Sequence, residues 1–257
     1  MQLPNKFRHF WGANKGNHAQ VCHFEKSGTL WVMNPFPSKA VVFWSSGKDS
    51  SIALYLSQKD PHLEVVGLFS TVEESSKRIG FHGTPETLIQ AQAESIGLPL
   101  WSVFLPPHCS NQDYESLVGT GLEKLRKLGV SHLVFGDLFL KDIREYRERF
   151  LHPLGFKTVF PLWERNTTHL SQEILALGFK ATVCAVNPQL IPDSYLGRHF
   201  DTSFLSSLKP GIDPCGENGE FHTFVTDGPI FRRPVKIRLG QSHQDRFSHW
   251  VELLPEG

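Results

Sequence analysis

Apolar residues are arranged in two distinct patterns along most of the chain: short unbroken runs, and stretches in which they recur at helical spacing. Short apolar runs without polar interruption, such as 40–44 and 63–69, are typical of strands buried on both faces of a parallel sheet. The runs expected to form strands are 40–44, 63–69, 100–105, 132–135, 158–160 and 180–186. Between them, apolar residues recur at helical spacing, which predicts helices starting near residue 49 and at 84–96, 110–128, 140–151 and 168–177.

Several helix boundaries have their own signals. Thr84-Pro85-Glu86 places an N-cap residue, a proline at the first turn and an acid near the positive end of a helix, and Gly97 ends that helix. The apolar residues expected to face the core in the next two helices are Leu117, Val118, Leu122, Leu125 and Leu128, followed by Ile143, Phe150 and Leu151. The strand–helix alternation predicts an α/β fold with a doubly wound parallel sheet.

The pattern changes after residue 165. A broken stretch from 187 to 219 leads into a tail, 221–252, that is rich in alternating β-type sequence, most clearly at 235–239. We therefore predict a smaller α+β C-terminal domain at 166–257 after a nucleotide-binding domain at 39–165. The cleft between two such domains is the expected ligand site.

The first 38 residues lack any regular period and are predicted to be an irregular extension. Met33 is the only methionine after Met1 and lies just before the first strand. We hypothesise that translation of the native protein starts at Met33, which N-terminal sequencing of protein made from the native gene would test.

Composition narrows the function classes. The chain has 257 residues, 40% of them hydrophobic, with 26 basic and 26 acidic side chains, so its formal net charge is zero. That balance speaks against an electrostatic nucleic-acid binder. The four cysteines form no CxxC pair, which speaks against a zinc ribbon, and no apolar run is long enough to cross a membrane. A cytoplasmic protein is the resulting expectation.

Residues 45–50, with the sequence Ser-Ser-Gly-Lys-Asp-Ser, join the first strand to the first helix; we call them the phosphate loop. A strand followed by a glycine turn and a helix N-terminus directs backbone N–H groups at one point, where an anion binds. The Walker A pattern does not fit, because Val42 stands at its first glycine and Asp49 at its final Ser or Thr. The loop resembles the PP-loop of ATP pyrophosphatases, which cleave ATP between the α- and β-phosphates, although Ser46 replaces a glycine.

Other polar residues follow the carboxyl ends of later strands. Ser70-Thr71 and Gly136-Asp137 end two of them, and parallel strands present such residues at one edge of the sheet. Asp137 could hold Mg²⁺ or simply be a turn carboxylate. Arg144 and Arg147, three residues apart on a charged helix, could clamp a carboxylate or phosphate, or could form a solvated helix face.

A second notable stretch is residues 211–223, which we call the glycine-rich loop. It contains three glycines, two glutamates, a cysteine and a histidine before a strand, more than a hairpin turn requires. One interpretation is a turn; the other is a substrate loop in which Glu217 and Glu220 bind a cation or amine and His222 carries a proton. Cys215 could be a nucleophile, but its context favours an inert thiol.

Six stretches together resemble the diphthine–ammonia ligase family and its prokaryotic relatives, within the adenine nucleotide alpha-hydrolase-like superfamily. They are WSSGKDS at 44–50, FHGTP at 81–85, QAQAESIGLP at 90–99, GDLF at 136–139, DPCGENGEFHT at 213–223 and DGPIF at 227–231. The resemblance implies a Rossmann-like ATP-binding domain followed by a substrate domain. It also implies a ligase that adenylates a carboxylate, releases pyrophosphate and forms an amide with ammonia.

The resemblance also implies roles for individual residues. Pyrophosphate would be held by Ser45, Ser46, Gly47, Lys48 and Ser50, with Ser70, Thr71 and Gly136 nearby, and Mg²⁺ by Asp49 or Asp137. The acceptor would meet Gly216, Glu217, Glu220 and His222. Arg144 and Arg147, from their spacing on one helix, are further expected substrate contacts. Lys48, Asp137, Glu220 and His222 are the expected catalytic residues.

Expected partners are ATP with Mg²⁺, ammonia and a carboxylate acceptor, for which a modified protein side chain is one candidate. We also expect a homo-oligomer. Two alternatives remain: a nucleotide-binding or sensing protein without amidation activity, and a PP-loop enzyme that adenylates an RNA base for thiolation. The second would favour a basic patch and paired cysteines, which this sequence lacks.

Overall fold

The computed structural model describes residues 36–80, 83–244 and 248–256. Residues 1–35 lie outside the described part, and with them nearly all of the predicted N-terminal extension and the proposed start at Met33. The chain divides into two units, Met1–Pro37 and Ser38–Gly257, and the described helices and strands all belong to the second.

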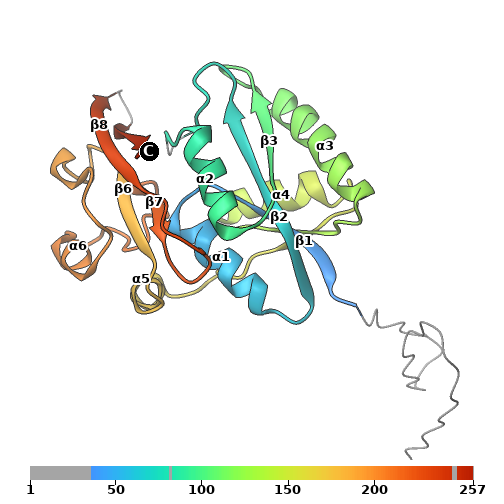
Figure 1. The fold of residues 1–257 in the computed structure, drawn as a ribbon, viewed down its shortest axis with the longest axis horizontal. Coiled ribbons are helices and arrows are strands. Elements are labelled where there is room, and N and C mark those ends of the chain that lie inside the picture. The colour runs from blue at the N-terminus through green and yellow to red at the C-terminus, as the bar shows by residue number, and fades with distance from the viewer. Residues whose placement is uncertain (1–35, 81–82, 245–247, 257) are drawn as a thin grey trace, which may run out of the picture. The chain divides into compact units, whose positions relative to one another are not determined.

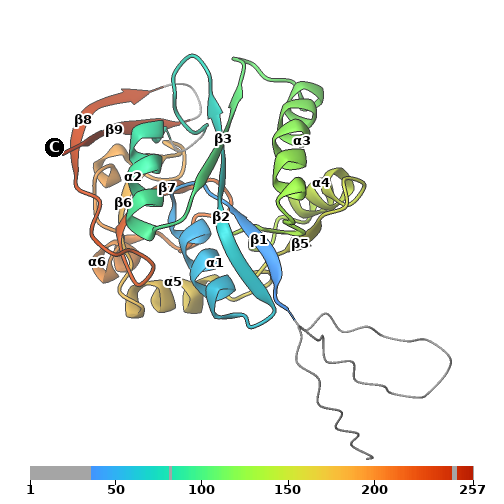
Figure 2. The ribbon, with the colours of Figure 1, turned by 45° about the vertical axis from the view of Figure 1, so that its right-hand side comes forward.

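The first sheet is parallel throughout and has the strand order β3-β2-β1-β4-β5. Its strands are β1 (Ser38–Phe43), β2 (Leu63–Glu73), β3 (Leu100–Leu105), β4 (His132–Val134) and β5 (Lys157–Val159). Figures 1 and 2 show α1 (Lys48–Lys59) and α2 (Glu86–Ile96) on one face of this sheet, and α3 (Asn111–Lys127) and α4 (Lys141–Leu151) on the other. The predicted doubly wound α/β sheet is therefore confirmed.

The buried run at the centre of the sheet explains why both faces are covered. Ala40, Val41 and Val42 are fully buried, although successive side chains of a strand point to opposite faces. Val42 packs in the cluster that contains the apolar residues of α1 and α2, whereas Val41 packs with those of α3. A strand that buries both faces needs an unbroken apolar run, as its sequence predicts.

The second sheet is antiparallel, with the order β7-β6-β9-β8. Its strands are β6 (Lys180–Val186), β7 (Phe221–Asp227), β8 (Ile237–Gln244) and β9 (His249–Pro255). The helices of this region are α5 (Thr167–Ala176), the 3-10 helix η1 (Asp193–Tyr195) and α6 (Thr202–Ser207). The predicted smaller α+β part is confirmed, but the strand expected at 235–239 begins at Ile237, after the backbone N–H of Val235 has bonded Thr226.

The second sheet lies on the side of the first sheet that α1 and α2 cover (Figures 1 and 2). One hydrophobic cluster joins them, with side chains such as Ile52 of α1, Ile89 of α2 and Val225 of β7. The predicted boundary at 165/166 falls between β5 and α5, inside the unit Ser38–Gly257, and the two-domain division stays a prediction. No helix in the described ranges is long and apolar enough to span a membrane.

In α3 and α4, fewer apolar residues are buried than the sequence predicts. In α3, Val118, Leu122 and Leu125 are buried, but Leu117 is 38% exposed and Leu128 is 57% exposed. Leu128 is the C-cap residue, so it lies beyond the last turn that packs on the sheet. In α4, Ile143 is 37% exposed, and only Leu151 is fully buried. Both helices contact the sheet through a narrow stripe.

Candidate active site

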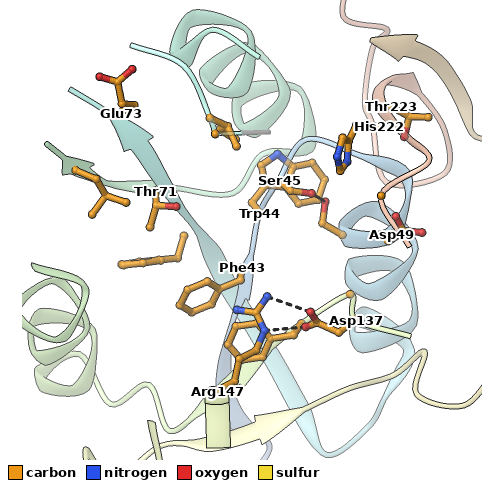
Figure 3. Close-up of a pocket in the computed structure, with 18 of the residues that line it drawn as sticks. Phe43, Trp44, Ser45, Asp49, Thr71, Glu73, Asp137, Arg147, His222 and Thr223 are labelled. Carbon is orange, nitrogen blue, oxygen red and sulfur yellow. Dashed lines mark hydrogen bonds and ion pairs between the residues drawn. The ribbon is translucent and has the colours of Figure 1, made fainter. Parts of the chain in front are cut away.

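A pocket of about 890 Å³ opens beyond the carboxyl ends of β1, β2, β3 and β4, with the glycine-rich loop on its other side. Figure 3 shows residues from both halves of the unit around it. The predicted site residues that line the pocket are Ser45, Lys48, Asp49, Ser50, Thr71, Gly136, Asp137, Arg147, Gly216, Glu217 and His222. The predicted residues that do not line it are Ser46, Gly47, Ser70, Arg144 and Glu220.

The phosphate loop presents an uncapped helix start to the pocket. Gly47 is the N-cap of α1 and provides no side-chain hydrogen bond, and the first backbone N–H bonded within the helix is that of Ser51, to the Gly47 carbonyl. The N–H groups of Asp49 and Ser50 therefore have no acceptor inside the helix. The hydroxyls of Ser45 and Ser50 lie 3.2 Å apart beside them. This arrangement is suited to an anion such as phosphate.

Ser46 supports the loop rather than facing the pocket. Its φ is 71°, in the left-handed region where glycine is favoured and other residues cost roughly 1–2 kcal/mol. The side chain is fully buried and its hydroxyl donates to Thr84 Oγ1 at 3.0 Å, while its carbonyl accepts from Val225 N at 3.0 Å. Glycine, which the resembled pattern has at this position, adopts this conformation without that cost, whereas Ser46 is held in it by hydrogen bonds to Thr84 and Val225. The hydroxyl of Ser70, donated to the Trp44 carbonyl, is likewise internal.

Gln92 of α2 holds the phosphate loop from behind, and sequence reasoning missed it. It is fully buried. Its Oε1 accepts from Trp44 Nε1 at 2.9 Å, and its Nε2 donates to the carbonyls of Ser46 at 3.1 Å and Val225 at 2.6 Å. One amide therefore binds the end of β1, the phosphate loop and β7. A polar residue among apolar positions of a predicted buried helix face was the available signal.

Gly136 lies at the closest approach between β4 and α1. A β-carbon on it would lie 2.8 Å from the Asp49 carbonyl carbon and 2.9 Å from Ser50 N, both backbone atoms. Only a residue without a side chain lets the phosphate loop sit so close to the end of β4.

We expect Gly136→Ala to destabilise the protein by about 1–3 kcal/mol, because the helix start must shift to admit the methyl group. Urea denaturation measures the change. Gly119→Ala is the matched control, since a β-carbon there would meet only Leu154 Cδ1, at 3.8 Å. Equal stability of the two variants would contradict the close-approach explanation.

Asp137 and Arg147 form a bidentate ion pair at the floor of the pocket (Figure 3). Arg147 Nε and Nη2 donate to the two carboxylate oxygens at 2.9 and 3.1 Å, and the guanidinium lies over the Phe135 ring at 4.4 Å. Arg144 faces elsewhere: it pairs with Glu148 at 2.8 Å and lies over Trp163. The two arginines thus separate, and only Arg147 reaches the pocket.

The glycine-rich loop is closed by two carboxylates. Asp213 accepts from the N–H groups of Cys215 and Glu217. Glu220 is 2% exposed and accepts from Asp213 N at 3.1 Å and from Asn218 N at 2.9 Å. Glu220, predicted to be catalytic, is therefore occupied inside the loop and does not line the pocket.

Glu217 is the glutamate that faces the pocket. Its Oε1 accepts from Leu138 N at 2.7 Å, which ties the loop to the segment after β4. Burial raises the pKa of Glu217 to about 7, and the nearby carboxylates of Asp49 and Asp137 contribute. Figure 3 shows His222 on the same side of the pocket as Ser45. The glycine-rich loop therefore supplies the pocket with a carboxyl group of raised pKa and with an imidazole.

The predicted metal ligands each have a cationic partner. Asp137 pairs with Arg147, and Asp49 Oδ2 pairs with Lys48 Nζ at 2.8 Å. Asp49 Oδ1 is buried and has no hydrogen-bond partner among the described residues, so it can accept a cation. The described ranges contain no group of three or more side chains that could bind a metal on their own. A magnesium ion would therefore depend on ligands from the nucleotide as well.

Sequence reasoning also missed the apolar wall of the pocket. Its aromatic members are Phe43, Trp44, Phe69, Tyr114, Phe135 and Phe221. The end of β3 and the segment after it add Leu105, Pro106, His108 and Cys109. Aromatic residues at strand ends were read only as core. The parallel order places the end of β3 at the same edge as the ends of β1 and β2, which was the signal for this segment.

Comparison with known proteins gives matches over both halves. Residues 38–158 match the family model for the diphthamide synthase N-terminal domain, and residues 166–252 match that for the diphthamide synthase C-terminal domain. Diphthine–ammonia ligases of Bos taurus and Homo sapiens are 30% and 29% identical over 165 residues, which cover 58% of this chain. That of Schizosaccharomyces pombe is 25% identical over 212 residues, 75% of this chain and 35% of its own length. The matches span about three fifths of the bovine and human proteins, 61% in each.

Proposed function

Because the chain belongs to the diphthamide synthase family, we propose that it is an ATP-dependent carbon–nitrogen ligase that converts a carboxylate to an amide with ammonia. The observation that carries the proposal is a single pocket in which an uncapped helix start faces a loop bearing Glu217 and His222. The first is suited to phosphates, and the second to proton transfer.

The nucleotide half is formed by the phosphate loop. The N–H groups of Asp49 and Ser50 and the hydroxyls of Ser45 and Ser50 bind the phosphates, and Thr71 and Gly136 lie beside them. Mg²⁺, when bound, neutralises phosphate charge, and Asp49 is the residue that would hold it, through Oδ1, which has no hydrogen-bond partner in the described part of the chain. The apolar wall limits access of water to a reactive intermediate.

The reaction has two steps. A carboxylate oxygen of the acceptor attacks the α-phosphorus of ATP, the bond to the β-phosphate oxygen breaks, and pyrophosphate leaves. Ammonium then gives a proton to Glu217, and the ammonia attacks the acyl carbon. The second proton passes to His222 as the bond to AMP breaks and the amide forms.

The acceptor is a carboxylate. The relatives are named diphthine–ammonia ligases, and we propose diphthine as the first acceptor to test. Arg147 lines the pocket, but its Nε and Nη2 already pair with Asp137, so it would bind an acidic substrate group by exchanging that partner. We also retain as proposals a cytoplasmic location, a homo-oligomer, and a division into an ATP-binding part at 39–165 and a substrate part at 166–257.

The test is to incubate the protein with ATP, Mg²⁺, ammonium and a protein that carries diphthine, and to identify the nucleotide product. We expect AMP and pyrophosphate in equal amounts, dependent on the acceptor, and an amide on the diphthine. Release of ADP would contradict the proposal. Binding of ATP without turnover, with or without the acceptor, would favour a nucleotide sensor instead.

A further inference from the structure

The ammonium group of Lys48 is enclosed between the phosphate loop and the glycine-rich loop. Lys48 is 2% exposed, and its Nζ donates to Asp49 Oδ2 at 2.8 Å and to the carbonyl oxygen of Cys215. The rings of Phe221 and Phe200 lie 5.2 and 5.9 Å from it. A carboxylate, a carbonyl and two aromatic faces together satisfy a charge that would otherwise be costly to bury.

Burial is the largest single effect on the pKa of Lys48 and lowers it, but the neighbouring acidic groups, Asp49 first among them, together raise it above its ordinary value. The hydrogen bonds of the ammonium group to Asp49 and to the Cys215 carbonyl connect the two loops.

The glycine-rich loop is attached to the segment after β4 through Glu217, to β6 through Phe221 and to the phosphate loop through Lys48. The bonds made by Asp213 and Glu220 close the loop on itself but do not attach it to the phosphate loop. Lys48 makes two of the attachments: Nζ binds the Cys215 carbonyl, and its backbone N–H binds Thr223 Oγ1 at 3.2 Å. The two attachments lie at Cys215 and Thr223, on either side of Glu217, and the second is within β7.

We infer that Lys48 is a positioning residue, which fixes the glycine-rich loop against the phosphate loop, and that it is not a phosphate ligand. The inference deepens the proposed function and rests on it. Cys215 lies two residues before Glu217, so the anchor at its carbonyl sets the distance between the proton-transferring carboxylate and the bound phosphates. Asp49 and the Cys215 carbonyl take two of the three donors of the ammonium group, so at most one donor is left for a phosphate.

The test is hydrogen exchange of the nucleotide-free protein by mass spectrometry. In Lys48→Met, which keeps the length of the side chain but not its charge, we expect amides of 213–221 to exchange roughly tenfold faster or more, with those of β2 and β3 unchanged. Lys48→Arg should restore part of the protection. Ser50→Ala is the control, because it alters the phosphate loop without removing a contact to the glycine-rich loop, and its exchange should match that of the wild type.

Kinetics separates positioning from phosphate binding. In Lys48→Met we expect KM for ATP within about threefold of the wild type, and kcat lowered by more than about tenfold. Unchanged exchange at 213–221 would overturn the inference, as would a KM for ATP raised more than tenfold with kcat unchanged. If Lys48→Met is not recovered folded, Lys48→Gln, whose shorter head cannot reach Cys215, is subject to the same outcomes. Failure of the wild type to release pyrophosphate would refute the proposed function but leave the exchange result standing.

Discussion

Replacement of Gln92 by glutamate should destabilise the protein by about 3 kcal/mol or more at neutral pH, even though the two side chains have nearly the same shape. Gln92 Nε2 donates to the carbonyls of Ser46 and Val225 in a fully buried site. A carboxylate would place an oxygen against two carbonyl oxygens with no donor between them. The bond that Oε1 accepts from Trp44 would survive, so the loss isolates the two donated bonds.

Chemical denaturation at pH 8 and pH 5 measures the effect. A proton on the introduced carboxyl would restore one donor, so the destabilisation should be smaller at pH 5. Gln90→Glu is the matched control, because Gln90 is exposed on the same helix. A loss at position 92 no larger than at position 90, or one independent of pH, would show that the amide does not hold the phosphate loop.

Gln92 also shows which parts of this site could be predicted from the sequence and which could not. The phosphate loop was predictable because its chemistry is local: a strand, a glycine turn and a helix start are neighbours in the chain. Gln92 forms hydrogen bonds to Ser46, Trp44 and Val225, which lie 46, 48 and 133 positions away from it in the chain. No local sequence pattern predicts contacts over such separations. Long-range contacts decided its role.

Lys48 and Glu220 are residues whose chemistry suggests catalysis but whose contacts in the fold indicate another role. Both are residue types that suggest chemistry, and both lie in stretches that resemble a catalytic family. The structure places Glu220 inside the glycine-rich loop and the ammonium of Lys48 between the two loops. A charged residue near an active site can serve by holding its neighbours, and only the fold distinguishes that from contact with substrate. Asp137 is similar, because Arg147, ten residues later, neutralises it.

The two halves of the pocket are also coupled through the backbone. Val225 N donates to the Ser46 carbonyl, so β7 continues hydrogen bonding directly onto the phosphate loop. The strand that carries His222 and Thr223 therefore cannot move without the loop that would hold the phosphates. This explains why a chain with two sheets forms one compact unit and why the proposed reaction can use groups from both.

Replacement of Glu217 by glutamine should lower turnover by about 10²–10⁴-fold, the usual contribution of a positioned base. Because burial raises the pKa of Glu217 to about 7, kcat/KM of the wild type should rise with pH around 7 as the carboxylate forms, and the variant should lack this rise.

Stability of the nucleotide-free protein should move in the opposite direction to activity. A carboxyl group whose folded pKa lies above its ordinary value of 4.5 binds its proton more tightly in the folded state. Its contribution to stability is therefore lost as pH rises from 4.5 through 7. Relative to Glu217→Gln, the wild type should lose roughly 2 kcal/mol between pH 5 and pH 8. Glu123→Gln, which removes an exposed carboxylate on α3, should show no such trend. A stability difference between wild type and Glu217→Gln that does not change with pH would mean that this carboxylate is already ionised at pH 5, and the proposed base would then have to be His222.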